Sequence, residues 1–118
     1  MGEEMTEPRW PSPWVRAALG TAILAALEGG PLHGYGIAVA LQGRGFGRPK
    51  GGSLYPLLTK LESDGAVTAT WEQGASGPGR KIYALTDTGR TRLEQERSSW
   101  HELAGALRYR DSDERGSQ

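Results

Sequence analysis

The sequence predicts an α+β fold in which three helices precede a β-hairpin and a fourth, longer helix follows it. Apolar residues recur every three or four positions over three early stretches, as in helices that bury one face. Two later stretches have strand-like patterns on either side of a glycine-rich connection. The chain has 118 residues, with 14 Lys and Arg against 14 Asp and Glu, so one small domain is expected.

The composition excludes several classes of protein. Without Cys there is neither a disulfide framework nor a thiolate metal site, and the acidic stretch 2–7 lacks the order of a signal peptide. The longest apolar-rich run, residues 17–27, is shorter than the about 20 residues needed to cross a bilayer. We therefore expect a cytoplasmic protein without a membrane segment, in which a second subunit completes a small core.

The first helix is expected over residues 14–27. Apolar residues recur every four positions from Val15 to Leu27, and the residues at 29–31, Gly-Gly-Pro, end the pattern. The helix is apolar nearly all round, so it must be covered on more than one face. Its own domain or a second subunit supplies that cover.

A second, shorter helix is expected over residues 33–42, where Ile37 and Leu41 lie four apart and Gly43 is the stop signal. The loop that follows, residues 43–52, is rich in Gly and basic residues. It completes neither the spacing of a nucleotide-binding P-loop nor that of a dinucleotide-binding fingerprint. We expect a flexible, basic connection.

The third helix is expected over residues 53–64, with four leucines on one face and Gly65 as a left-handed stop. Pro56 is expected in the first turn, which places the start of the helix at Gly52 or Ser53. The opposite face has the composition of a helix that enters a DNA major groove, with hydrogen-bonding and cationic side chains at Ser53, Tyr55, Thr59 and Lys60.

Two strands are expected at residues 66–72 and 80–85, joined by a glycine-rich tip. A last helix is expected over residues 86–109, with Thr86 as its N-cap. This helix has a coiled-coil-like seam for which the domain offers no partner, formed by Leu93, Trp100, Leu103 and Leu107.

Three helices followed by a hairpin wing is the order of a winged helix-turn-helix. We expect a flexible tail at 1–12, the winged-helix domain at 13–85, a dimerisation helix at 86–109 and a disordered tail at 110–118. Residues 29–81 hold six basic and three acidic residues, a pattern typical of a nucleic-acid binder. A solvated basic loop would give the same count.

Several segments of the chain also resemble one known family. Residues 31–35 read PLHGY, residues 50–58 read KGGSLYPLL, residues 77–83 read GPGRKIY, and Leu85-Thr86 follows. In this order, and over about Val15 to Leu107, the chain resembles the PadR family of bacterial transcriptional regulators. The resemblance implies a winged-helix domain that binds double-stranded DNA, a last helix that dimerises against the partner's first and last helices, and repression of neighbouring genes.

The resemblance also implies which residues contact DNA. Lys50 stands before the third helix where the family frequently has Ser, and adds a cation that we expect to contact phosphate. Gly36 departs from the family's acidic or polar residue and weakens the second helix. The residues that match DNA-facing positions of the family are Tyr35 near phosphates, Ser53, Tyr55 and Lys60 on the recognition helix, and Arg80 and Lys81 on the wing.

A homodimer is expected to bury Val15, Leu19, Leu93, Trp100, Leu103 and Leu107 between its subunits, and to bind a palindromic operator. Trp100 would meet its symmetry mate, either as an anchor of the dimer core or, with Leu103, as a slot for a planar aromatic effector. Small members of the family that bind planar drugs or dyes have a Trp at this point. The expected protein is thus a repressor released by such an effector.

No catalytic site is expected. His33 precedes a helix start and His101 lies on the last helix, and the sequence places no partner near either, so neither a triad nor a metal site nor a cofactor site can be assembled. The alternative to a DNA-binding regulator is a winged helix that contacts another protein and does not bind DNA.

Overall fold

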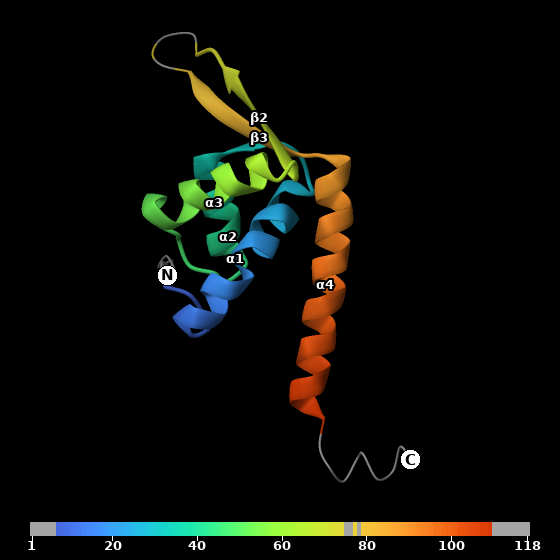
Figure 1. Cartoon of the computed structure of the whole chain (residues 1–118). Helices are drawn as coiled ribbons and strands as arrows, with labels where there is room; N and C mark the ends of the chain where they lie inside the picture. Colours follow the sequence, from blue (N-terminus) through green and yellow to red (C-terminus); the bar gives the residue numbers. More distant parts are fainter. Residues whose placement is uncertain (1–6, 75–76, 78, 110–118) are drawn as a thin grey trace.

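The computed structural model describes residues 7–74, 77 and 79–109, and the predicted α+β winged-helix order is confirmed (Figure 1). Within these residues no helix is both long and apolar enough to span a bilayer. Four helices and three strands follow one another as α1 (Ser12–Leu27), β1 (Leu32–His33), α2 (Gly34–Gly43), α3 (Gly51–Ser63), β2 (Val67–Glu72), β3 (Arg80–Leu85) and α4 (Asp87–Arg108).

The core lies where α1, α2 and α3 meet under the sheet. Each helix contributes side chains with almost no solvent exposure, as the apolar spacing predicts, and burial of one such side chain stabilises the fold by about 1.5–3 kcal/mol. The largest fully buried side chains are Ile23, Leu24, Leu27, Ile37, Leu41, Leu58, Leu61, Val67 and Leu93.

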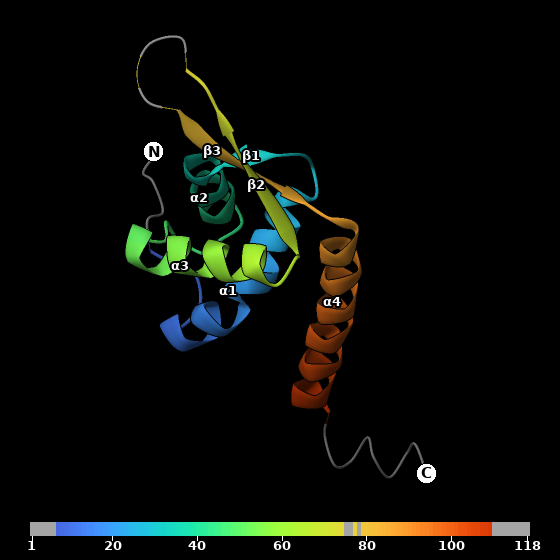
Figure 2. The same ribbon diagram turned by 45° about the horizontal axis from the view of Figure 1, so that its top comes forward.

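The sheet has the strand order β1-β3-β2, with both neighbouring pairs antiparallel (Figure 2). The predicted hairpin is β2 and β3, paired from Val67 opposite Leu85 to Glu72 opposite Arg80. Strand β1 was not predicted, because two residues are too few to show an alternating pattern. Its Leu32 pairs with Tyr83, which fixes the start of α2 against the base of the wing.

Helix α3 begins one or two residues before the predicted start. The carbonyl of Lys50 accepts hydrogen bonds from the backbone N–H groups of Ser53 and Leu54 at 2.9 Å each, so the first turn includes both glycines. Pro56 therefore lies inside the helix and not in its first turn. Gly65, with φ of +81°, confirms the left-handed stop.

The predicted N-cap of α4 is confirmed and joins three elements. The hydroxyl of Thr86 accepts a hydrogen bond from the backbone N–H of Gly89 at 2.9 Å and donates to the carbonyl oxygen of Gly65 at 2.6 Å. The backbone N–H of Thr86 also bonds the carbonyl of Ala66 at 3.1 Å. The start of α4 is thereby fixed to the end of α3 and to the base of β2.

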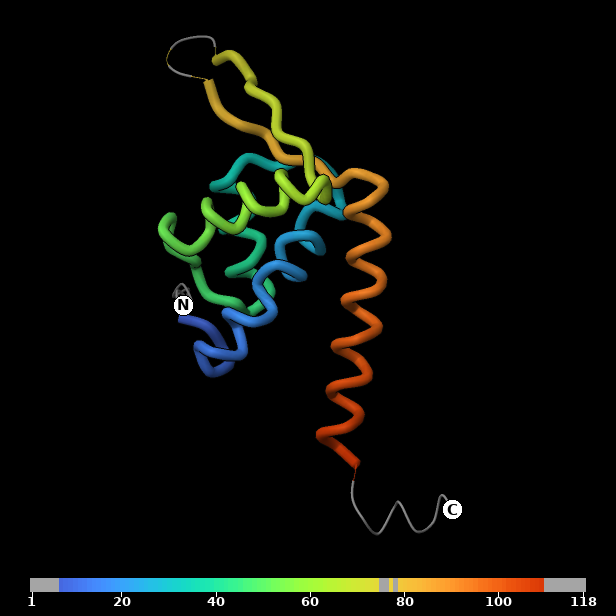
Figure 3. Tube along the Cα trace, in the orientation of Figure 1, coloured from blue at the N-terminus to red at the C-terminus, as the bar shows by residue number. Residues whose placement is uncertain are grey.

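The prediction that the last helix has no partner within the domain is wrong. α4 runs antiparallel to α1 and packs on it (Figure 3). The indole N–H of Trp100 donates to the hydroxyl of Thr21 at 3.0 Å, and this hydroxyl donates to Glu96 at 2.5 Å. Arg97 donates two hydrogen bonds, of 2.8 and 3.1 Å, to the carboxylate of Glu28, and the pKa of Glu28 is lowered by them.

Two residues assigned to the dimer interface need correction for the same reason. Leu93 is 1% exposed and Leu19 is 6% exposed within the single chain, where both belong to the core. Their periodic spacing correctly indicates burial, but the covering residues come from the same molecule.

The chain before α1 is packed from Pro8 onward, earlier than the domain start expected at residue 13. The backbone N–H of Arg9 bonds the carbonyl of Gly45 at 2.8 Å, and the ring of Trp10 lies 5.5 Å from that of Phe46. Residues 1–6 of the expected N-terminal tail and the whole C-terminal tail at 110–118 lie outside the described residues.

Two glycines of α4 allow a matched test of the junction at its N-terminus. A Cβ at Gly89 would lie against the carbonyl oxygen of Ala66, whereas a Cβ at Gly105 would meet nothing within 4 Å. We predict that Gly89→Ala lowers the free energy of unfolding by about 1–3 kcal/mol through overpacking. Gly105→Ala should raise it by up to about 1 kcal/mol through helix propensity. Urea denaturation at one protein concentration measures both, and equal stabilisation would contradict the close contact at Gly89.

Candidate nucleic-acid interface

The outer face of α3 is exposed because its leucines are held in the core. Helical spacing of about 100° per residue puts Gly52, Pro56, Thr59 and Ser63 at the centre of this outer face. All four are exposed. Of them only Thr59 was predicted: Gly52 and Pro56 have no hydrogen-bonding side chain, and Ser63 lies at the end of the helix, away from the N-terminal half in which the predicted residues cluster.

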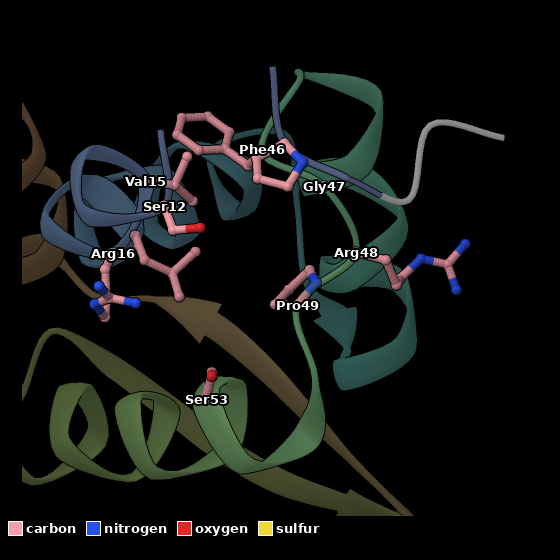
Figure 4. Close-up of a pocket in the computed structure, with 10 residues that line it drawn as sticks. Ser12, Val15, Arg16, Phe46, Gly47, Arg48, Pro49 and Ser53 are labelled. Atoms are coloured by element: carbon pink, nitrogen blue, oxygen red, sulfur yellow. The ribbon is translucent and has the colours of Figure 1, made fainter. Parts of the chain in front are cut away.

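The other predicted residues of α3 lie at the edges of this face. Tyr55 leans over the start of α2, where its ring would touch a Cβ at Gly34. Ser53 points to the opposite side, into a cavity of about 170 Å³ between α1, the α2–α3 loop and the first turn of α3 (Figure 4). The structure therefore places Ser53 and Tyr55 on different sides of the helix.

The same cavity is lined by a third residue of the predicted dimer interface, which is half-buried in the single chain and whose contact with a second subunit stays a prediction. Val15 lines it together with Ser12 and Phe46, so this side chain faces the loop of its own chain (Figure 4). The exposed part of α1 that faces α4 is formed by other residues, described below.

Two of the predicted DNA-binding cations have acidic partners. The ammonium of Lys60 lies 3.4 Å from the carboxylate of Asp64, and that of Lys81 lies 3.7 Å from Glu62. Lys50 and Arg80 are exposed and form no ion pair within residues 7–74, 77 and 79–109. Neither cation has a carboxylate within 4 Å in the described chain, although Glu72 stands opposite Arg80 in the strand register.

A concave surface lies between the wing and the helices α2 and α3, and the hollow that it encloses has a volume of about 410 Å³. Trp71, which is 68% exposed, stands on its wing side opposite Lys81 in the strand register. Sequence reasoning missed Trp71 as a surface residue, because its alternation with Thr70 and Glu72 reads equally well as a core-facing position. The lining residues are His33, Gly34, Tyr35, Tyr55, Thr59, Trp71, Gly79, Arg80, Lys81 and Tyr83.

Side chains around this surface fix the wing relative to the helices. An imidazole nitrogen of His33 lies 2.9 Å from the carboxylate of Glu72, which ties β1 to β2. Burial raises the pKa of the Tyr83 phenol at the base of the wing. A hydrogen bond from Arg92 of α4 lowers the pKa of Asp64, the carboxyl that also pairs with Lys60.

A second, apolar groove of about 410 Å³ lies between the first turns of α1 and the last turns of α4. It brings together Trp100, Leu103 and Leu107, as the seam predicts, and Leu107 is 80% exposed. Trp14, which is 64% exposed, completes the groove and was missed. The sequence signal that could have identified Trp14 is its position three residues before Ala17 on an apolar helix, which puts the two side chains on one helix face.

Metal chemistry has no candidate in the described part of the chain, which contains no group of three or more His, Asp or Glu side chains suited to hold an ion. The arrangement instead offers an exposed helix face, an aromatic and cationic concave surface beside it, and a separate apolar groove.

The sequence profile of the transcriptional regulator PadR-like family matches residues 23–95. The transcriptional regulator Rv3488 of Mycobacterium tuberculosis is 34% identical over 89 residues, which cover 75% of this chain and 81% of that protein. An uncharacterized 37.1 kDa protein in a transposon of Streptomyces fradiae is 40% identical over 85 residues, which cover 72% of this chain but only 24% of that longer protein.

Solved structures with the same fold include regulators of this family. The PadR family transcriptional regulator of Eggerthella lenta superposes with a TM-score of 0.74 at 32% identity, covering 80% of this chain and 82% of that one. Bacillus subtilis PadR, crystallised in complex with operator DNA, superposes with a TM-score of 0.60 at 33% identity, covering 66% of this chain and 45% of that one. With the family profile matching more than half of its length, this chain belongs to the PadR-like family of transcriptional regulators.

Proposed function

We propose that this chain is a homodimeric transcriptional regulator that binds DNA in a sequence-specific manner in the cytoplasm. The observation that carries the proposal is the position of α3, whose inner face is buried while its outer face lies beside the concave, cationic surface of the wing. The similarity to Bacillus subtilis PadR, whose crystal structure contains operator DNA, supports it.

In the proposed complex α3 of each subunit enters the major groove of a palindromic operator, with half-site centres about 10 bp apart. Thr59 and Tyr55 read base edges or methyl groups. Ser53, on the side of α3 that faces α1, contacts the border of the major groove nearest that helix. The phosphate backbone is positioned by Tyr35, Lys50, Lys60, Arg80 and Lys81. Lys50 and Arg80 contribute most of this attraction, since Lys60 and Lys81 must first give up their carboxylate partners.

The second subunit is proposed to cover the groove between α1 and α4. Trp14, Leu103 and Leu107 expose apolar area that a symmetric partner with the same groove would bury. This interface includes neither Leu19 nor Leu93, because the chain itself buries both.

The proposed regulator represses transcription and is released by a planar aromatic effector at Trp100. The N–H edge of this indole is occupied by Thr21, so the ring face is the part that a flat ligand can stack on. Release requires the effector to bind one arrangement of the two subunits more tightly than the arrangement that fits DNA.

Binding to DNA should depend steeply on salt. We predict that the affinity for a labelled duplex falls linearly on logarithmic axes as salt rises, with a slope of about −0.9 for each phosphate neutralised. Fluorescence anisotropy at several salt concentrations measures this slope. An absence of DNA binding at low salt would favour the alternative, a winged helix that contacts another protein.

Removal of an unpaired cation should cost more affinity than removal of a paired one. Arg80→Gln is predicted to weaken DNA binding more than Lys60→Gln, because Arg80 forms no ion pair with any carboxylate of the described residues whereas Asp64 already screens Lys60. In Lys60→Gln the carboxylate keeps its contact with Arg92 at 3.2 Å, so no new unpaired charge arises. The same anisotropy titration compares the two variants, and an equal or larger loss for Lys60→Gln would contradict the assignment.

Trp100 is the residue to test for an effector. Quenching of Trp fluorescence by a panel of planar aromatic compounds is predicted to vanish in Trp100→Ala and to persist in Trp71→Ala, whose indole lies on the wing. Light scattering must show that the Trp100 variant is still a dimer. Quenching that survives in a dimeric Trp100→Ala protein would leave this Trp as a packing residue only.

A further inference from the structure

We propose that Arg48, supported by the ring of Tyr35, forms an additional binding site for a phosphate of the DNA backbone in the loop between α2 and α3. Neither residue belongs to the outer face of α3 or to the wing. The inference rests on the proposed DNA binding and adds a contact that the sequence did not assign, since Arg48 was read only as part of a basic loop.

The guanidinium of Arg48 is held by two contacts that leave its outer end available. Its central carbon lies 5.5 Å from the centre of the Tyr35 ring, and Nε donates a hydrogen bond to the side-chain oxygen of Gln42 at 2.6 Å. A guanidinium has five N–H groups, and this bond uses one. The two terminal nitrogens make no hydrogen bond to any residue of 7–74, 77 or 79–109.

The backbone that precedes Arg48 is held in a defined turn. Gly45 and Gly47 adopt positive φ angles of +96° and +77°, which shape the turn that precedes it. The backbone N–H of Phe46 bonds the carbonyl of Leu41 at 3.0 Å, and that of Arg9 bonds Gly45 at 2.8 Å. A side chain already held in place loses less conformational entropy on binding than a free one.

The chemistry around Arg48 favours an anion with several acceptor oxygens. No acidic residue occurs between Glu28 and Glu62, so the loop has no carboxylate of its own to pair with this cation. The Arg48 guanidinium lies over the ring of Tyr35, which is 69% exposed and also lines the concave surface beside the wing. Phosphate suits the planar fork of Arg, which can donate two parallel hydrogen bonds to it.

A purely structural role for Arg48 would predict different behaviour. If the side chain only tethers the loop to Gln42, loss of its charge changes stability and does not change how DNA affinity depends on salt. The salt dependence counts neutralised phosphates, so it separates the two roles.

The test is the salt dependence of binding to a labelled duplex of mixed sequence for wild type, Arg48→Gln and Arg108→Gln. Arg108 is a matched control, since it is an exposed Arg in the last turn of α4, at the far end of that helix from the wing (Figure 1). We expect the slope for Arg48→Gln to be shallower by about 0.9 per subunit, and Arg108→Gln to match wild type. Arg48→Lys, which keeps the charge, should retain most of the wild-type slope.

A second pair of variants tests the support by Tyr35. Tyr35→Phe keeps a ring under the guanidinium, whereas Tyr35→Leu removes it. The fold-decrease of DNA affinity in the double variant Tyr35→Leu, Arg48→Gln should be smaller than the product of the fold-decreases in the two single variants, because both substitutions act on one contact. Thermal unfolding confirms that each variant is folded.

The outcomes separate this inference from the proposed function. Wild-type protein that binds DNA, together with an unchanged slope in folded Arg48→Gln, overturns the phosphate site and leaves DNA binding established. Wild-type protein that does not bind the duplex at low salt overturns both. Single losses that multiply in the double variant overturn the role of the Tyr35 ring.

Discussion

The burial of the second half of α1 is the packing interaction on which the other elements depend. Residues 22–27 are six consecutive buried positions, and a helix turns by about 100° per residue, so they need partners on every side. α2, β3 and α4 all pack against α1 and supply them. The helix α2, the wing strand β3 and the last helix therefore take their positions from one shared centre, and α3 is joined to it through α2 and β2. The first half of α1 leaves Trp14 exposed.

The parts of the fold that the sequence predicts are those set by local rules. Helix periodicity, the Thr86 cap and the Gly65 stop each depend on neighbours along the chain, and all three are confirmed. Strand β1 could not be predicted, because its partner β3 lies about fifty residues later and only tertiary pairing defines it. Leu19 and Leu93 show a related limit, since apolar spacing indicates that a residue is buried but not whether its own chain or a second one covers it.

The candidate interface was predictable in composition but not in geometry. The sequence places Ser53 and Tyr55 two residues apart, and only the structure shows that they lean toward α1 and α2 respectively. The charge count predicts a basic region at residues 29–81, yet two of its cations, Lys60 and Lys81, lie beside carboxylates in the folded chain. Asp64 links this surface to the last helix, because its carboxylate contacts Lys60 of α3 and Arg92 of α4. The charge on α3 and the position of α4 are thus physically connected.

The junction at Thr86 fixes one end of a long helix, α4. Its first turn is bonded to the end of α3 and to the base of the wing, and its 22 residues span about 33 Å at 1.5 Å per residue. A rotation of about 5° at the fixed end moves the far end by about 3 Å over a helix of that length. A displacement of that size at the far end of α4 would thus require only a small rotation at the end that is bonded to α3.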